Sequence, residues 1–155
     1  MRAAAPATQM PAFAGTLTPA DIEALVAFVY APPAQRPVWG AAEIAASRVV
    51  HHAAGTLPDK PQFDADPLNL FVVVEAGDHH ASILDGDRLE RLARFPTRYA
   101  LHGGPKFTPD GRHVYFASRD GWVAKYDLWN LKTVAEVRAG LNTRNIAVSG
   151  DGRWV

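Results

Sequence analysis

The sequence predicts a mainly β fold made of about two blades of a β-propeller, preceded by one short helix and a proline-rich segment. Two repeated motifs carry this prediction. The run Phe107–Arg112 (FTPDGR) reappears as Val148–Arg153 (VSGDGR) at an offset of 41 residues. The pair Leu84-Asp85 reappears as Tyr126-Asp127 at an offset of 42 residues. A period of roughly 40–45 residues, with about four short strands in each unit, is typical of propeller blades.

Residues 1–31 form the first of three predicted pieces and hold one helix. Thr18 is expected to be its N-cap, Pro19 opens the first turn, and the carboxylate of Asp21 stabilises the positive end of the helix dipole. Apolar residues then recur at helical spacing, at Ile22, Leu25, Val26 and Val29. The pair Pro32-Pro33 ends the helix. Because a single helix of this length is not stable alone in water, it must pack against another part of the protein.

Residues 32–67 form the second piece, a linker. Prolines stand at positions 32, 33, 37, 58, 61 and 67, and this density favours a semi-rigid spacer over an element of the core. The sequence allows a short helix from Ala41 to Val50, and the pair His51-His52 follows it.

Residues 68–155 form the third piece, in which strands and turns alternate. The expected strands are Leu70–Val74, Ser82–Leu84, His113–Ala117, Trp122–Tyr126 and Val134–Val137. Asp85-Gly86 and Asp120-Gly121 mark tight turns, because both positions of an Asp-Gly pair tolerate positive φ. Single blades cannot bury their faces, and the sequence stops within a strand-like run. We therefore expect the chain to be an internal part of a longer protein.

The composition argues against several classes of function. The net charge is +0, whereas nucleic-acid binding needs an excess of basic side chains. The chain has no cysteine, which excludes disulfides, thiolate metal sites, thiol catalysis and covalent haem attachment within it. No run of ~18 apolar residues predicts a membrane-spanning helix. The first residues lack the apolar stretch of a signal peptide.

One long stretch resembles the first blades of a known propeller. It reads TRYALHGGPKFTPDGRHVYFASRDGWVAKYDLWNLKTVAEVRAG at 97–140 and continues as LNTRNIAVSGDGR. It is similar to the eight-bladed haem d1 propeller of the cytochrome cd1 nitrite reductase superfamily. The series Tyr-Ala-x-His, Asp-Gly-Arg, Ser-Arg-Asp and Asp-Leu-Trp is specific to this family and is not a general propeller pattern. The resemblance covers about residues 68–155 and implies an incomplete propeller that binds a tetrapyrrole.

The start of the chain is similar to a different family. Met10-Pro11-Ala12-Phe13, followed by Thr18-x-x-Asp21, resembles the methionine loop and C-terminal helix of a small c-type cytochrome. This implies that residues 1–31 are the tail of a cytochrome c domain. It also implies that Met10 is a ligand of the haem c iron in the full-length protein. The alternative is a terminal methionine that binds no metal.

Two departures from the nitrite reductases favour a member of the superfamily that acts in haem d1 biosynthesis. His102 is followed by Gly103-Gly104-Pro105-Lys106, as in the biosynthetic proteins, and not by Ile-Ser-Arg. Ala76 stands where the reductases hold a cofactor carboxylate with an arginine, and the pair His79-His80 is nearby. The resemblance thus implies a dihydro-haem d1 dehydrogenase, which oxidises a propionate to an acrylate. A nitrite reductase and a non-catalytic propeller scaffold that binds another protein are the alternatives.

The resemblance also assigns residues to a tetrapyrrole site. His102 is expected to be the axial ligand of the haem d1 iron, since neutral imidazole is a common iron donor. Arginine suits the carboxylates of the macrocycle, because its planar fork pairs bidentately and keeps its charge when desolvated. The candidates for this role are Arg94, Arg98, Arg119 and Arg144, with Lys106 close to the ligand. The simpler alternatives are a loop histidine that contacts only backbone and solvated turn arginines, and the latter is expected for Arg112 and Arg153.

The same resemblance implies the setting of the protein. Haem d1 is the expected cofactor, or dihydro-haem d1 the substrate, with haem c in the full-length protein. The expected partners are the tetrapyrrole, an electron-transfer protein and a nitrite reductase, in the periplasm. No nucleic acid and no membrane span are expected, and no catalytic acid or base is assigned. This chain alone is expected to be inactive.

Overall fold

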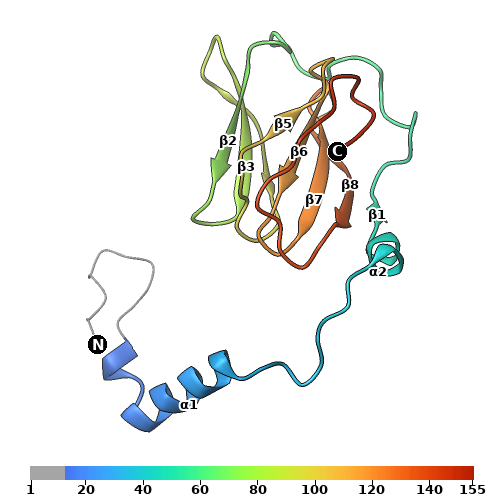
Figure 1. Ribbon diagram of the computed structural model, residues 1–155. Helices are drawn as coiled ribbons and strands as arrows, with labels where there is room; N and C mark the ends of the chain where they lie inside the picture. The colour runs from blue at the N-terminus through green and yellow to red at the C-terminus, as the bar shows by residue number, and fades with distance from the viewer. Residues whose placement is uncertain (1–12) are drawn as a thin grey trace. The chain divides into compact units, whose positions relative to one another are not determined.

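The computed structural model describes residues 13–155, and the chain divides into two compact units after Val38 (Figure 1). Met10 lies outside the described residues, so its role as a haem c ligand stays a prediction. The first unit contains a short 3-10 helix at Phe13–Gly15 and the helix α1 at Pro19–Tyr30. Across residues 13–155, none of the helices has the length and apolar character needed to cross a membrane.

Helix α1 begins as the sequence predicts. The Asp21 N–H donates to Thr18 Oγ1 at 3.2 Å, and the Thr18 N–H donates to the Asp21 carboxylate at 2.9 Å. These two bonds form a capping box, which satisfies backbone donors at the helix start. The Thr18 hydroxyl and N–H also lower the pKa of Asp21. Within Pro19–Tyr30 all side chains are at least partly exposed, and Phe28 and Tyr30 are largely so.

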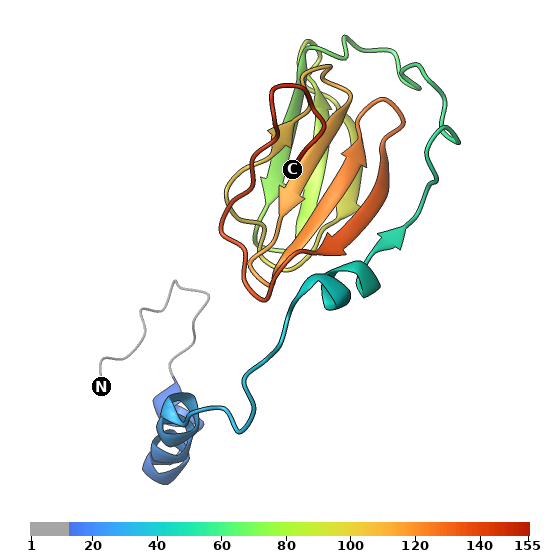
Figure 2. The ribbon, with the colours of Figure 1, turned by 45° about the vertical axis from the view of Figure 1, so that its right-hand side comes forward.

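Residues 39–155 form two antiparallel sheets that pack face to face (Figures 1 and 2). The first sheet has the order β2-β3-β4, with its strands at Leu70–Glu75, His80–Asp85 and Arg91–Pro96. The second has the order β1-β8-β7-β6-β5. Its strands are β1 at Val49–Val50, β5 at Lys106–Phe107, β6 at His113–Ala117, β7 at Trp122–Asp127 and β8 at Lys132–Arg138. These sheets are the two propeller blades that the sequence predicts.

A shared apolar core lies between the sheets. It includes Ile83 of β3, Val114 of β6 and Tyr126 of β7, all of which are fully buried. Phe95 of β4 stacks on Tyr126, with ring centroids 4.0 Å apart and an angle of 14° between the planes. Each large apolar side chain buried here stabilises the fold by about 1.5–3 kcal/mol, which explains why the two blades pack on each other.

The sequence repeat is also a repeat of hydrogen bonds. In the turn Thr108–Arg112, the carboxylate of Asp110 accepts the N–H of the residue two positions later, at 3.0 Å. In the turn Ser149–Arg153, the carboxylate of Asp151 accepts the corresponding N–H at 3.1 Å. The glycine after each aspartate has a φ of +69°, a left-handed conformation that glycine adopts without strain. The predicted repeat is therefore confirmed in three dimensions.

The helix expected from Ala41 to Val50 is wrong in its second half. Helix α2 spans only Ala41–Ala46, and Val49–Val50 form β1 instead. These two residues pair with Ala135 and Glu136 of β8. The β-branched valines favour an extended strand, and the free edge of β8 supplies its hydrogen bonds. The strands β4 and β5 were also not predicted.

The middle part of the expected spacer is held against β8. Trp39 Nε1 donates to Arg138 O at 2.9 Å, and the Arg138 N–H donates to Ser47 Oγ at 2.9 Å. The guanidinium of Arg138 also lies over the Trp39 ring, 4.8 Å from its centroid. Residues 39–52 therefore pack as part of the second sheet, because a tryptophan and a pair of valines interrupt the proline-rich stretch.

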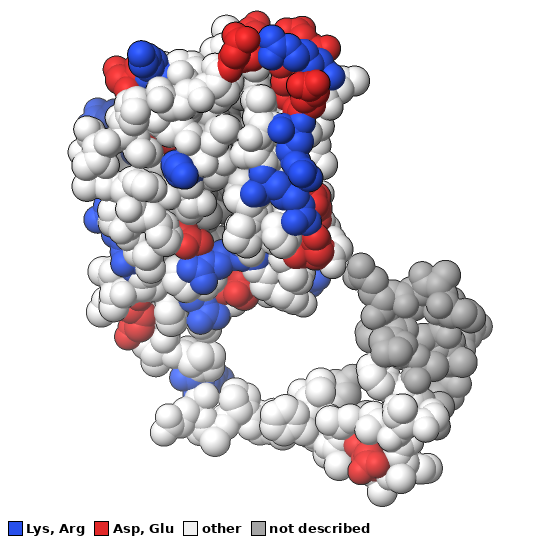
Figure 3. All heavy atoms as spheres, turned by 180° about the vertical axis from the view of Figure 1, so that it is seen from behind, with Lys and Arg blue, Asp and Glu red and all other residues white. Residues whose placement is uncertain are grey.

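Arg112 is not the solvated turn arginine that the sequence suggests. Its side chain is only 18% exposed, forms ion pairs with Asp59 and with Asp127 (3.1 Å), and lies over the ring of Trp129. It therefore joins the segment around Asp59 to the end of β7. Arg153 is exposed, as expected. Figure 3 shows basic and acidic side chains intermixed on one face of the molecule, in line with a net charge of +0.

Candidate functional site

The candidate site lies where four connections meet at one end of the two sheets. They are the β2–β3 turn, the β4–β5 connection, the β6–β7 turn and the segment after β8. Backbone hydrogen bonds join them: the Thr97 N–H donates to His79 O (2.7 Å), the Arg119 N–H to Ala100 O (3.0 Å) and the Ala139 N–H to Gly121 O (2.8 Å). Each bond links two different connections, so their backbones hold one another in place.

His102 lies in the β4–β5 connection, at the edge of the second sheet. The backbone N–H of His102 donates to Ala117 O at 2.8 Å, so the pairing of this sheet edge with β6 continues into the connection. Its Nδ1 lies 2.6 Å from Arg144 O. Because a carbonyl oxygen can only accept, Nδ1 carries the proton and Nε2 keeps its lone pair. The residue is exposed, so it has the tautomer and the access that a metal ligand requires.

The two glycines after His102 have different roles. Both have positive φ, +85° at Gly103 and +69° at Gly104. A Cβ at Gly103 would lie 2.7 Å from Arg144 O, so this glycine allows the two connections to approach each other. At Gly104 the nearest atom to such a Cβ is Lys106 Nζ, 3.9 Å away, so this position has room. The expected approach of a macrocycle to this pair stays a prediction, and the geometry leaves space for it at Gly104.

Lys106 stabilises the same connection. Its Nζ donates to Gly103 O at 2.7 Å and lies 3.5 Å from Gly104 O. A cavity of about 110 Å³ lies beside this loop and is lined by Val74, Leu101–Pro105, Phe116 and Ala117. Sites that enclose drug-sized ligands usually have about 300–1,000 Å³, so a large ligand would have to bind over the exposed face of His102.

Two of the predicted arginines are held by carboxylates of the chain itself. Arg94 Nη2 lies 2.8 Å from Glu75 Oε2 and also pairs with Asp78. The hydrogen bond between Glu75 and Arg94 is the main cause of the raised pKa of Arg94 and the lowered pKa of Glu75. Arg98 forms two hydrogen bonds with Glu136, at 2.7 and 3.0 Å. Binding of another carboxylate by either arginine would compete with these pairs.

The other two predicted arginines lie beside His102. Arg119 is in the β6–β7 turn, and Arg144 is in the segment that supplies the carbonyl for His102. Both are exposed, and among the described residues neither forms an ion pair. The structure therefore brings His102, Lys106, Arg119 and Arg144 together. Their roles in binding a cofactor stay predictions.

Sequence reasoning gave no role to two aromatic residues of this region. The rings of His79 and Tyr99 have centroids 5.2 Å apart, and Tyr99 is 61% exposed. Tyr99 belongs to the Tyr-Ala-x-His pattern, which is the only sequence signal that could have marked it. For residues 13–155, no group of three or more His, Cys, Asp or Glu side chains is arranged to hold a metal ion.

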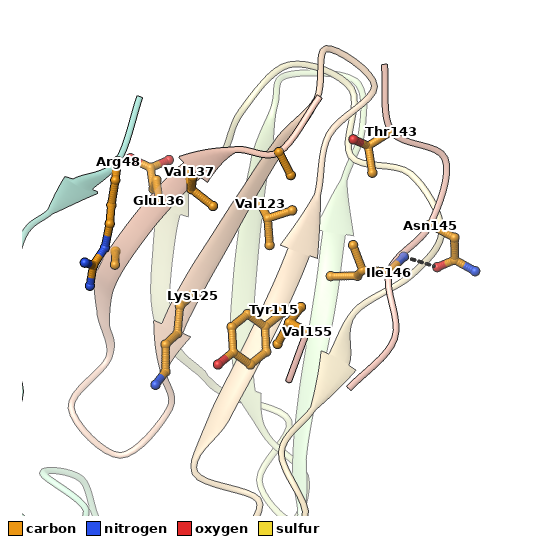
Figure 4. A pocket seen from close by; sticks show the side chains of 12 residues that line it. Arg48, Tyr115, Val123, Lys125, Glu136, Val137, Thr143, Asn145, Ile146 and Val155 are labelled. Carbon is orange, nitrogen blue, oxygen red and sulfur yellow. Dashed lines mark hydrogen bonds between the residues drawn. The ribbon is translucent and has the colours of Figure 1, made fainter. Parts of the chain in front are cut away.

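A second, larger cavity of about 450 Å³ lies on the face of the second sheet. Figure 4 shows Tyr115 of β6, Val123 of β7 and Val137 of β8 along this face, with Ile146 and Val155 of the C-terminal segment beside them. Its lining is mainly apolar and includes neither His102 nor Arg119. This face has the character of a packing surface, and the candidate site remains the region around His102.

Comparison with known proteins identifies the family of the strand-rich part of the chain. Residues 65–155 match the family described as Cytochrome D1 heme domain. Over 150 residues, the chain is 70% identical to the dihydro-heme d1 dehydrogenase of Pseudomonas aeruginosa, an alignment that covers 97% of this chain and 30% of that protein. Over 88 residues it is 35% identical to Protein NirF of the same organism, covering 56% of this chain and 22% of that protein.

A solved structure agrees with these matches. The dihydro-heme d1 dehydrogenase NirN in complex with DHE superposes on this chain with a TM-score of 0.84 at 69% identity. The superposition covers 97% of this chain and 32% of that one. The chain thus spans less than a third of the length of the curated relatives it matches.

Proposed function

Because the chain belongs to the cytochrome D1 heme domain family, we propose that it is part of a dihydro-haem d1 dehydrogenase. The 70% identity to the enzyme of Pseudomonas aeruginosa favours this activity over nitrite reduction and over a scaffold without cofactor. Since the chain covers 30% of that enzyme, the activity is proposed for the full-length protein.

The geometry of His102 is the observation that carries this proposal. The carbonyl of Arg144 holds the proton on Nδ1, which leaves the lone pair on Nε2 of an exposed residue. The backbones of Arg119 and Arg144 contact the connection that carries His102, and both residues are exposed, so their guanidinium groups are available to the carboxylates of a tetrapyrrole. The residues present therefore fit an iron tetrapyrrole bound over this end of the sheets.

Each residue has a defined task in the proposed reaction. His102 holds the iron of the substrate through Nε2, while Arg119 and Arg144 orient its carboxylates. Lys106 fixes the carbonyls of the loop that carries His102. The change of a propionate into an acrylate removes two electrons and two protons from the bound dihydro-haem d1, and a haem c in the full-length protein would take up the electrons one at a time. Arg94 and Arg98 remain further candidates for carboxylate contacts, although internal acids hold them.

The cellular setting follows from the same proposal. The full-length protein would act in the periplasm, as part of denitrification. An electron-transfer protein and a nitrite reductase are its proposed protein partners, the first as electron acceptor and the second as recipient of the finished haem d1.

The test compares two activities in one protein. It uses the full-length protein that contains this chain, or the Pseudomonas aeruginosa enzyme with its matching 150 residues replaced by this chain. Conversion of dihydro-haem d1 to haem d1 is expected, with no nitrite reduction. His102→Ala is expected to change the visible spectrum of the bound tetrapyrrole, and His113→Ala serves as a control. An unchanged spectrum in His102→Ala would remove His102 as the ligand.

A further inference from the structure

We propose that His79 donates a hydrogen bond from Nε2 to a carboxylate of the bound tetrapyrrole and thereby helps to select the substrate. This inference rests on the proposed function, because it needs a tetrapyrrole over His102. It adds an imidazole donor to the arginines and the lysine that are expected to contact the carboxylates.

Backbone contacts fix His79 against the connection that carries His102. His79 ends the β2–β3 turn with a φ of +59°, an uncommon conformation for a residue with a side chain. Its carbonyl accepts the Thr97 N–H at 2.7 Å, and its Nδ1 accepts the Ala100 N–H at 3.3 Å. Ala100 precedes His102 by only two residues, so its Cα lies within roughly 7 Å of the Cα of His102.

The bond to Ala100 determines where the proton of His79 lies. A backbone N–H can only donate, so Nδ1 of His79 is unprotonated and Nε2 carries the hydrogen. At His102 the arrangement is the reverse, because Nδ1 donates to Arg144 O. One imidazole thus offers a lone pair from Nε2 and the other offers a hydrogen from Nε2. The first suits a metal ion, and the second suits an anionic oxygen.

The neighbours of His79 leave this donor available. Among the described residues, no hydrogen bond to His79 Nε2 is present, whereas His80 Nδ1 bonds to Asp78 O at 2.9 Å. The carboxylate of Asp78 would repel an anionic ligand, but Arg94 pairs with it. Tyr99 packs on the His79 ring and presents an exposed aromatic face beside it, which suits the edge of a flat macrocycle.

The substitution His79→Asn tests the donor separately from the fold. The amide oxygen of asparagine can accept the Ala100 N–H as Nδ1 does, and asparagine tolerates positive φ, but it lacks a donor at the position of Nε2. In the full-length protein, the dissociation constant of the His79→Asn variant for dihydro-haem d1 is expected to rise about tenfold. The visible spectrum of the bound iron is expected to stay the same, since His102 is intact. His80→Asn is the matched control and is expected to bind normally.

A chemical change in the ligand provides the second measurement. If His79 contacts a carboxylate, full methyl esterification of dihydro-haem d1 should shrink the difference in affinity between the unmodified protein and His79→Asn, because an ester carbonyl accepts a weaker hydrogen bond than a carboxylate. His79→Gln retains an N–H donor near the position of Nε2 and should bind the natural ligand within about threefold of the unmodified protein.

The outcomes separate this inference from the proposed function. Equal affinity of the unmodified protein and His79→Asn for the natural ligand would overturn the role of His79 alone. A changed iron spectrum in His79→Asn would also overturn it, because His79 would then act only by positioning His102. Failure of the unmodified protein to bind any tetrapyrrole would instead overturn the proposed function.

Discussion

Arg98 lies over the indole ring of Trp122, with its guanidinium carbon 3.8 Å from the ring centroid. The same guanidinium binds Glu136 through both of its carboxylate oxygens. His51, which follows β1, also contacts Glu136 Oε2, at 2.9 Å. Burial acts to raise the pKa of Glu136, but the hydrogen bonds from Arg98 and His51 hold it below its usual value. This cluster joins the β4–β5 connection, β7, β8 and the segment after β1.

The substitution Arg98→Lys is expected to lower the free energy of unfolding by about 1–2 kcal/mol. Lysine cannot hold both oxygens of Glu136 and stack on Trp122 at the same time. Urea denaturation of the full-length protein, followed by tryptophan fluorescence, would measure the change. Arg91→Lys is the control, since Arg91 is exposed on β4. An equal effect of the two substitutions would show that the cluster adds nothing to stability.

Arg119→Gln and Arg144→Gln are each expected to weaken binding of the tetrapyrrole by about three- to thirtyfold, through loss of a charge-assisted hydrogen bond. The bond from His102 to residue 144 uses the backbone carbonyl, so Arg144→Gln should leave the iron spectrum unchanged. Equilibrium titration followed by visible absorbance would give both quantities. Arg153→Gln, an exposed arginine in the repeated turn, should bind normally. Equal affinities for all three variants would rule out a contact by either arginine.

Gly121→Ala is expected to destabilise the fold by about 2 kcal/mol or more. Gly121 has a φ of +95°, and an added Cβ would lie 1.7 Å from Gly140 O, a backbone atom that cannot rotate away. Gly150→Ala is the control, because a Cβ there meets no atom within 4 Å. The difference between the two melting temperatures is the measurement. A small effect at Gly121 would mean that the segment after β8 moves without cost.

His113 is expected to make stability depend on pH. Burial lowers the pKa of His113 below 6.5, with Lys125 acting in the same direction and Asp127 against it. The unfolded chain therefore binds a proton at a pH where the folded chain does not. As a result, stability falls as the pH drops from 6.5 through the folded pKa. His113→Gln should lose less stability between about pH 7 and about pH 5.

Denaturation curves recorded at several pH values would measure this dependence. His52→Gln provides the control, since His52 borders the same side of β6 and β7 but should leave the slope of the unmodified protein in place. The same slope in His113→Gln and in the unmodified protein would contradict the assignment.

Local patterns predicted the parts of the fold that short-range interactions determine. The Thr18 cap, the Asp-Gly turns and the strands around Val72 and Val114 follow from neighbours in the chain. The pairing of β1 with β8 joins residues more than 80 positions apart, and nothing in the sequence near Val49 indicates it. For the same reason the sequence predicts a solvated turn residue at Arg112, although its partner Asp59 lies 53 positions away.

The candidate site shows the same limit. The resemblance selected His102, Arg119 and Arg144, and the structure places them at one end of the sheets. The sequence could not show that the Arg144 carbonyl fixes the tautomer of His102, because the two residues are 42 positions apart. Nor could it show that Arg94 forms an ion pair with Glu75 and that Arg98 forms one with Glu136, since these pairs form only when the strands come together.

The pairing of β1 with β8 has a practical consequence for any shortened form of the protein. Residues 39–52 cover backbone donors and acceptors of β8 that would otherwise be open to another molecule, yet they lie outside the 65–155 family match. A truncation that begins at Leu68, where the blades were expected to start, would leave these backbone groups of β8 unpaired. They could then bind a strand of another molecule. Such a product should self-associate into aggregates, whereas one that begins before Trp39 keeps its own cover.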